Sequence, residues 1–179
     1  EGYSDIIRLL VGADIRVNLE DQNCRTTSLH EAAENGRAEI VKILLENRDN
    51  NAEPDLVRTS DGRTPLHLAA MNGDVATTRI LISYVKCLDP VDPDYRTPLH
   101  LACLNGHNKV VNMLIDAGAD LECLDNEGTS PLHLAQYLSE DTKTKMEKKA
   151  GKKRRTAIIS ENLGGRTDET SSWCGHQSS

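Results

Sequence analysis

The sequence predicts an all-α solenoid, in which short helix–turn–helix units stack along one axis. A tetrapeptide ending in His occurs four times in the 179 residues, as Thr27-Ser-Leu-His30, Thr64-Pro-Leu-His67, Thr97-Pro-Leu-His100 and Ser130-Pro-Leu-His133. The last three copies start 33 residues apart, and the first gap is 37 residues. A fixed period of this size indicates supersecondary units that bury their apolar faces against one another.

One unit can be read from residue 64 onward. Thr64 is suited to cap a helix, because its hydroxyl can accept a hydrogen bond from an unpaired N–H of the first turn. Pro65 follows at the first helical position, where its missing N–H costs nothing. The helix is expected to end at Asn72-Gly73, since glycine readily adopts the left-handed conformation. A second helix is predicted from about Asp74 to Tyr84, and a finger loop from Leu88 to Arg96.

Other features recur with the motif. Asn-Gly pairs occur at 35–36, 72–73 and 105–106, and Gly-Ala-Asp occurs at 12–14 and 118–120. One small residue stands at an equivalent place in each unit: Ala32, Ala69, Ala102 and Ala135. On these residues, positions 1 to about 138 resemble the ankyrin-repeat family. The resemblance implies stacked helix pairs with protruding fingers that bind another protein.

Three segments are expected. Residues 1–26 form a partial first repeat with a second helix and a finger, and the chain therefore reads as a fragment or as starting with an incomplete unit. Residues 27–138 hold units that start near 27, 64, 97 and 130, the last incomplete. Residues 139–179 form a basic and then Ser/Gly-rich non-repeat tail, disordered at its end. The basic segment either completes the last unit as a helix or follows a repeat that is cut short.

The extra residues in the long first gap fall at 48–60. This stretch contains Asp49, Glu53 and Asp55, so it is expected to bulge out as an acidic loop.

The motif histidines have two possible roles. They could form a ladder for metal ions or protons, or each could make a structural hydrogen bond to the neighbouring unit, as the family resemblance implies. The chain lacks a catalytic triad pattern, paired acids of defined spacing and a phosphate-binding glycine loop. We therefore expect neither enzyme activity nor a cofactor or metal. The five cysteines show no metal-like spacing and are expected to be reduced thiols, with Cys103 buried.

A candidate partner-binding site follows from the position just before the Asn-Gly pair. Met, Leu and Tyr occupy it at 33-residue intervals, so stacking should align them in an exposed apolar row. Arginines flank the row on the finger side and alternate with acidic residues. We hypothesise a groove for apolar side chains of an extended or helical peptide, with rim charges selecting its register. Alternatively, the apolar residues only pack against neighbouring fingers. The site comprises Glu34, Asp61, Arg63, Met71, Asp94, Arg96, Leu104, Glu127 and Tyr137.

Charge is distributed unevenly along the chain. Residues 1–138 carry 12 basic and 22 acidic residues, whereas residues 139–179 carry nine and six. One basic cluster resembles a nuclear-import signal. The same cluster could instead contact nucleic acid or anionic lipid, or be a solvated tail. Its members are Lys148, Lys149, Lys152, Lys153, Arg154 and Arg155.

Three functions remain open at this point. The first is a monomeric scaffold or adaptor in the cytoplasm or nucleus that binds another protein. The second is the cytosolic ankyrin segment of a larger channel, kinase or ligase-subunit protein, whose activity lies elsewhere. The third is nucleic-acid or membrane contact through the basic tail; the acidic repeats would repel nucleic acid, so any such contact is expected at the tail. The sequence shows no apolar run long enough to span a membrane.

Overall fold

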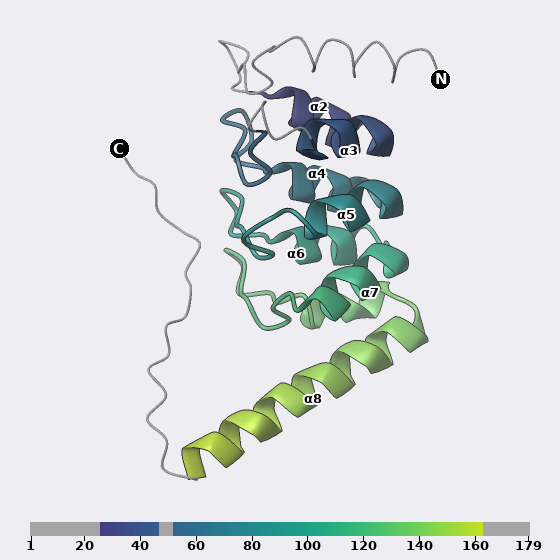
Figure 1. Ribbon diagram of the computed structural model, residues 1–179. Coiled ribbons are helices and arrows are strands. Elements are labelled where there is room, and N and C mark those ends of the chain that lie inside the picture. Colours follow the sequence, from purple (N-terminus) through teal and green to yellow (C-terminus); the bar gives the residue numbers. More distant parts are fainter. Residues whose placement is uncertain (1–25, 47–51, 163–179) are drawn as a thin grey trace.

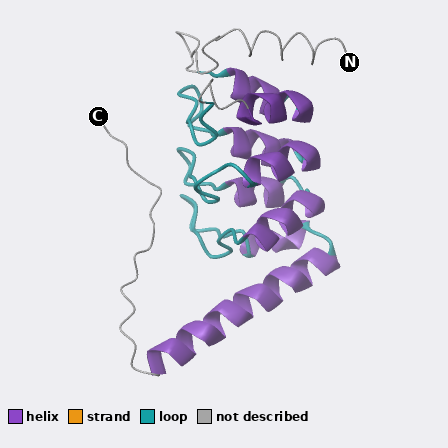
Figure 2. Cartoon of the chain, viewed as in Figure 1, coloured by secondary structure: helices purple, strands orange, loops and turns teal. Residues whose placement is uncertain are grey.

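A computed structural model describes residues 26–46 and 52–162, with side chains described as far as Lys153. Its helices form two stacked layers beside a column of loops (Figures 1 and 2). The inner layer consists of α2 (Ser28–Glu34), α4 (Pro65–Asn72), α6 (Pro98–Leu104) and the 3₁₀ helix η1 (His133–Tyr137). The outer layer consists of α3 (Ala38–Glu46), α5 (Val75–Ile82) and α7 (Asn108–Ala117), and α8 (Glu140–Asn162) crosses the end of the stack obliquely (Figure 1). The predicted partial repeat at 1–26 lies almost wholly outside the described residues, as does the chain beyond 162.

Each inner α-helix begins as predicted, at a motif threonine. Thr27, Thr64 and Thr97 have extended backbones, and the hydroxyl of each accepts a hydrogen bond from the N–H of the motif histidine three residues later. The histidine ring in turn accepts from the threonine N–H. This reciprocal arrangement satisfies backbone donors that the first helical turn leaves unpaired.

The end of α4 also agrees with the prediction. Gly73 follows the helix with a φ of 70°, in the left-handed region. A Cβ atom at this position would lie 2.5 Å from Nδ1 of His107, which belongs to the next unit. Glycine is therefore required at residue 73 both by the backbone conformation and by the packing of the neighbouring repeat.

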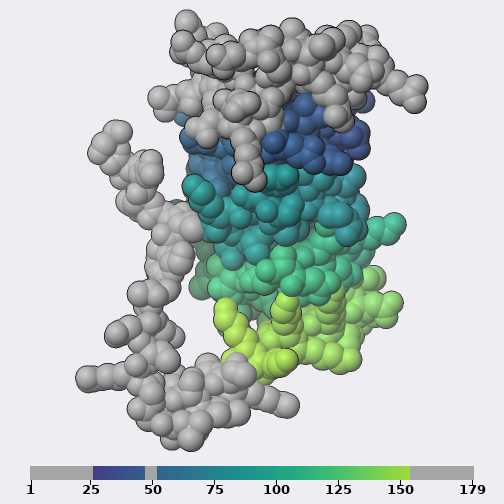
Figure 3. All heavy atoms as spheres, in the orientation of Figure 1, coloured from purple at the N-terminus to yellow at the C-terminus, as the bar shows by residue number. Residues whose placement is uncertain are grey.

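The interior is built from short aliphatic side chains, as expected for a chain without Phe. The repeated alanines Ala32, Ala69, Ala102 and Ala135 are all buried. Cys103 is completely buried beside Ala102, which confirms that it serves as a small core residue. Burial of this surface in a continuous stack is the main stabilising contribution, because each helix pair alone is too thin to enclose a core. The space-filling view shows the described units in direct contact (Figure 3).

The last unit ends differently from the others. Its first helix is a short 3₁₀ segment, η1, and a 23-residue helix, α8, follows directly. Thr142, Met146 and Ala150 of α8 are buried, and the helix packs against α7 and η1. Of the two interpretations left open by the sequence, the structure supports the first, since the basic segment is a helix that covers the last unit.

The long connection before α4 is only partly described, because residues 47–51 are not. The described portion is folded back: Arg58 and Arg63 form a β-bridge, and Ala52 packs against the core. The carboxylate of Asp55 accepts a hydrogen bond from the backbone N–H of Lys86 at 3.1 Å. The expected acidic loop at 48–60 is thus anchored to the next unit from residue 52 onward.

Candidate partner-binding surface

The first three motif histidines connect successive units. Nε2 of His30, His67 and His100 lies 3.2, 3.0 and 3.1 Å from the carbonyl oxygens of Arg63, Arg96 and Thr129, respectively. In each case Nδ1 accepts from a backbone N–H, so Nε2 carries the proton and donates it to the next finger. Both ring nitrogens of these three histidines are engaged, which confirms the predicted hydrogen bond to the neighbouring unit for His30, His67 and His100.

The environment of these rings favours the neutral imidazole. Burial lowers the pKa of His67 to about 4, and it also lowers the pKa values of His30 and His100. His133 differs because it is exposed, at the end of the series of fingers. Among the described residues, His, Cys, Asp and Glu side chains do not gather in groups of three that could hold a metal ion. Cys87, Cys103 and Cys123 form no disulfide with one another.

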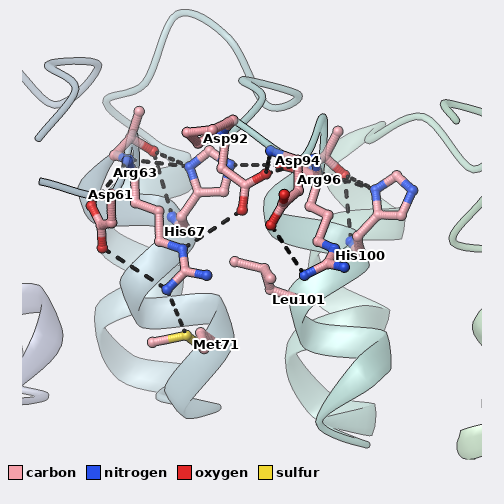
Figure 4. Close-up of polar contacts among 12 residues, drawn as sticks. Asp61, Arg63, His67, Met71, Asp92, Asp94, Arg96, His100 and Leu101 are labelled. Atoms are coloured by element: carbon pink, nitrogen blue, oxygen red, sulfur yellow. Dashed lines mark hydrogen bonds and ion pairs between the residues drawn. The ribbon is translucent and has the colours of Figure 1, made fainter. Parts of the chain in front are cut away.

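Two predicted site residues, Arg63 and Arg96, occupy equivalent places at the foot of successive fingers. Each side chain runs along the face of its inner helix (Figure 4). Nη1 of Arg63 lies 3.4 Å from Sδ of Met71, within hydrogen-bonding distance for sulfur. This contact links the finger side of the predicted site to its apolar row.

Carboxylates from two fingers surround each arginine. Nε of Arg63 lies 3.7 Å from Asp92 of the next finger, and Nη1 lies 3.9 Å from Asp61 of its own. The pattern repeats one unit later: Arg96 lies 4.0 Å from Asp125, 3.4 Å from Asp94 and 3.8 Å from Glu127. These ion pairs are longer than direct hydrogen bonds, and the buried Nε atoms of both arginines lack a hydrogen-bond acceptor. The Nε atoms are out of reach of a partner, but the side chains of Arg63 and Arg96 are 23% and 28% exposed, so a partner could contact the outer part of each guanidinium group.

Two aspartates in this arrangement, Asp92 and Asp125, with side chains 2% and 6% exposed, were missed by sequence reasoning. Oδ1 of Asp92 accepts from the N–H groups of Asp94 and Arg96, at 3.0 and 2.9 Å. Asp125 accepts in the same way from Glu127 and Thr129, at 3.0 and 2.8 Å. Each aspartate thus shapes its finger while it faces the arginine of the preceding unit. Their 33-residue spacing was the available signal.

The apolar row is unevenly exposed. Leu104 and Tyr137 are 41% and 59% exposed, whereas Met71 is half-buried and packs against the core. Glu34, the first member, is paired with Arg58, which also binds Asp61; the N···O distance is 2.6 Å in both pairs. Burial of Asp61 acts to raise its pKa, but the hydrogen bond and charge of Arg58 bring that pKa below its usual value. The apolar part available to a partner is therefore centred on Leu104 and Tyr137.

The fingers expose further apolar side chains that sequence reasoning missed. In each finger, one of these residues comes just before a residue whose backbone N–H donates a hydrogen bond across the finger turn. They are Val57, Val91 and Leu124, which are 46%, 38% and 58% exposed. Because the units stack, these equivalent positions follow one another along the fingers. The sequence contained a weak indication of this exposed series, because Val91 and Leu124 are one 33-residue repeat apart.

Tyr95 is the most unusual finger residue. It has a φ of 59°, and it is the one non-glycine residue in the described part of the chain with a positive φ. The equivalent positions hold Gly62 and Gly128, with φ values of 66° and 73°. The Tyr95 side chain is 52% exposed. A bulky residue held in a left-handed conformation costs about 1–3 kcal/mol, and such strain clusters at functional sites.

The basic cluster lies on α8, the helix that follows the last repeat unit. Lys149 donates to the carbonyl oxygen of Ile115, and Lys153 pairs with Asp120 at 3.1 Å. Lys148 and Lys152 are exposed. The side chains of Arg154 and Arg155 lie outside the described residues, and the import-signal hypothesis remains a prediction.

The comparisons with known proteins agree with this architecture. A family model described as ankyrin repeats (3 copies) matches residues 1–90, and another, described as ankyrin repeats (many copies), matches residues 84–135. The chain belongs to the ankyrin-repeat family, whose repeats are a protein–protein interaction module.

Several larger proteins are similar over the repeats. The chain is 38% identical over 85 residues to a probable E3 ubiquitin-protein ligase, XBOS33, of Oryza sativa subsp. japonica. It is 36% identical over 84 residues to the ankyrin repeat and KH domain-containing protein mask-1 of Caenorhabditis elegans. It is also 36% identical over 85 residues to the human BCL-6 corepressor-like protein 1. These matches cover 46%, 45% and 46% of this chain but only 15%, 3% and 4% of the relatives. Within residues 26–46 and 52–162, every helix is too short or too polar to cross a bilayer.

Proposed function

We propose that this chain is a binding module that recognises another protein through the face where the fingers meet the inner helices. The supporting observation is the repeated arrangement of Arg63 and Arg96, whose part-exposed guanidinium groups belong to the same units as the exposed apolar side chains. A protein segment can supply backbone carbonyl oxygens to the guanidinium groups and an apolar side chain to Leu104 and Tyr137. Catalysis is not part of this role, which is that of a scaffold or adaptor.

The charge of this face defines the kind of partner. Asp94 and Glu127 project from the fingers with side chains 57% and 76% exposed, and together with Asp61 they outnumber the two arginines. A partner segment with aliphatic or aromatic side chains flanked by Lys or Arg would complement this pattern. The exposed carboxylates would act mainly on association rate and register, since solvent screens them.

Tyr95 supports the same face. It belongs to the same finger as exposed Val91 and Asp94, and tyrosine provides a large contact area with little conformational entropy to lose. A position that other fingers fill with glycine carries a strained aromatic residue here. We propose that Tyr95 is an anchor for the partner and that binding compensates for the local strain.

The proposal can be tested without knowing the natural partner. Random peptides displayed on phage would be selected on the full chain, and the enriched peptides measured by fluorescence anisotropy. We expect enriched peptides to combine apolar and basic residues. Leu104→Asp should weaken their binding by about tenfold or more, because it places a charge in the apolar centre.

A matched control is provided by Tyr84→Asp. Tyr84 follows α5 in the outer layer and is 41% exposed, the same fraction as Leu104. This control should change binding less than about twofold. Equal loss in the two variants, or enrichment of peptides that ignore both, would refute the proposed face. The combined variant Met71→Asp and Leu104→Asp extends the test, once circular dichroism shows that it is folded.

A second proposal is that these repeats act within a larger protein whose activity lies outside the sequence given. It is supported by the relatives, of which the matched region makes up 15% or less in the three cases above. An antibody raised against residues 64–133 would report the size of the natural protein on an immunoblot. A band near 19.7 kDa, the mass of this chain, would contradict the second proposal.

A further inference from the structure

The last helix, α8, presents two different faces. Thr142, Met146 and Ala150 recur every four residues and are buried against the stack. Lysines at 145, 148, 149 and 152 have the spacing i, i+3, i+4 and i+7, which places them together on the flank of the helix. The helix is thus held by a narrow apolar stripe and carries a stripe of positive charge beside it.

Part of the lysine stripe contacts the carboxyl end of α7. Nζ of Lys145 lies 2.8 Å from a carboxylate oxygen of Asp116, and Lys149 donates to the carbonyl oxygen of Ile115. The carboxyl end of a helix carries a partial negative charge, which would repel an anion. Because Lys149 occupies one of these carbonyl groups, the repulsion is reduced at this point.

A shallow hollow of about 590 Å³ lies along this flank. We call it the lysine hollow. Four lysines and two aspartates line it, which leaves an excess of two positive charges in a chain whose overall charge is −7. Lys148 and Lys152 are the exposed members of the stripe. Its lining residues are Asp116, Asp141, Thr144, Lys145, Lys148, Lys149 and Lys152.

We propose that the lysine hollow binds a compact, multiply phosphorylated anion, either a soluble polyphosphate or the headgroup of a phosphoinositide lipid. Ammonium groups are strong donors to phosphate oxygens, and several of them converge here within two helical turns. The volume is in the range of small-molecule sites.

A long polyanion fits the surrounding charge less well than a compact one. Residues 1–138 carry a net charge of −10, from 12 basic and 22 acidic residues. A duplex that extended beyond the hollow would run along this acidic body and be repelled. The anion would also have to displace Asp116 from Lys145, and a multiply charged phosphate is a stronger competitor for that ammonium group than a single carboxylate.

Isothermal titration calorimetry of the full chain with inositol hexakisphosphate tests the soluble source. Co-sedimentation with phosphatidylcholine vesicles that contain phosphatidylinositol bisphosphate tests the lipid source, with phosphatidylserine vesicles of equal charge for comparison. The double variant Lys148→Gln and Lys152→Gln should weaken binding by about tenfold or more. Added salt should weaken it as well, because the contacts are ionic.

The matched control is the double variant Lys109→Gln and Lys143→Gln. It removes the same charge from α7 and α8 at residues that do not line the hollow. We expect its binding to stay within about twofold of the natural chain. Equal weakening by both double variants would mean a non-specific charge effect and would overturn the site. Failure of both phosphate probes to bind, or binding of duplex DNA alone, would overturn it too. These readouts do not involve Leu104 or Tyr95, so they are independent of the proposed partner face.

Discussion

Nε2 of His67 lies 3.0 Å from the carbonyl oxygen of Arg96, the residue immediately before the next motif threonine. The side chain that helps to cap one helix thereby fixes the finger that leads into the following one. The same Arg96 directs its side chain toward Asp125 of the finger after that. His67 and Arg96 therefore connect the helix cap, the contact between units and the proposed partner face.

Replacing His67 by alanine should lower the free energy of unfolding by about 2–4 kcal/mol. The change creates a cavity and leaves the carbonyl group of Arg96 and the N–H of Thr64 without partners in a buried place. Urea unfolding monitored by circular dichroism measures the effect. His133→Ala, at an exposed position, should cost less than about 1 kcal/mol. Equal losses at the two sites would contradict the assigned role.

Stability should fall in mild acid because of the same rings. Burial lowers the pKa of folded His67 to about 4, whereas its ordinary value is 6.5. The unfolded chain therefore binds the proton first, and the stabilising contribution, complete above pH 6.5, is lost as the pH falls toward 4. For His67 the loss is on the order of 3 kcal/mol.

Thermal or urea unfolding across this pH range would show the slope. A His67→Gln variant supplies the comparison, since it lacks the titrating group and should show a shallower dependence. The carboxyl group of Asp61 has a lowered pKa, so its contribution to stability is lost only below pH 3.8, its ordinary pKa. That pH range lies below the one in which His67 acts, so the two effects can be separated. A variant with an unchanged slope would disprove the assignment to His67.

Tyr95→Gly should stabilise the fold by about 1 kcal/mol, because glycine adopts a φ of 59° without steric cost. The same change should weaken binding of selected peptides by removing the exposed ring. Tyr95→Ala separates the two effects, since it removes the ring but keeps a strained non-glycine residue. Melting temperature and anisotropy would be measured on both variants. Unchanged peptide binding in both would exclude Tyr95 as an anchor.

Gly73→Ala should be more destabilising than Gly128→Ala. Both glycines are left-handed, with φ values of 70° and 73°, so both variants incur a conformational cost of about 1–2 kcal/mol. Only the Cβ at residue 73 meets the ring of His107, at 2.5 Å, while residue 128 faces open space. The difference between the two unfolding free energies isolates the clash, and a difference near zero would show that His107 moves aside freely.

The repeat architecture could be predicted because its signals are local. Thr64, Pro65 and Gly73 act within one or two turns of the chain, and their roles follow from backbone geometry that any helix shares. The link from His67 to the next unit was expected from the family resemblance, and its acceptor, Arg96, became known from the structure.

Other features depend on packing that a single sequence does not reveal. The helix α8 buries Thr142, Met146 and Ala150, a stripe too weakly apolar to stand out among the surrounding lysines. The left-handed conformation of Tyr95 was not predicted, because its one sequence signal is that the equivalent positions in the neighbouring units hold Gly62 and Gly128. Met71 was predicted to be part of an exposed apolar row, but it is half-buried, and the guanidinium group of Arg63 lies against its sulfur atom.

The arginine–aspartate contacts between fingers have a consequence for how such a chain can change in length. Residues 64–96 contain one complete set of donors and acceptors, and the set is repeated 33 positions later with the same partners. A tandem duplication of this segment would meet matching surfaces on both sides and would lengthen the binding face by one step. Deletion of the same 33 residues would shorten it without leaving a mismatched junction, so recombination could alter the reach of the protein while preserving its chemistry.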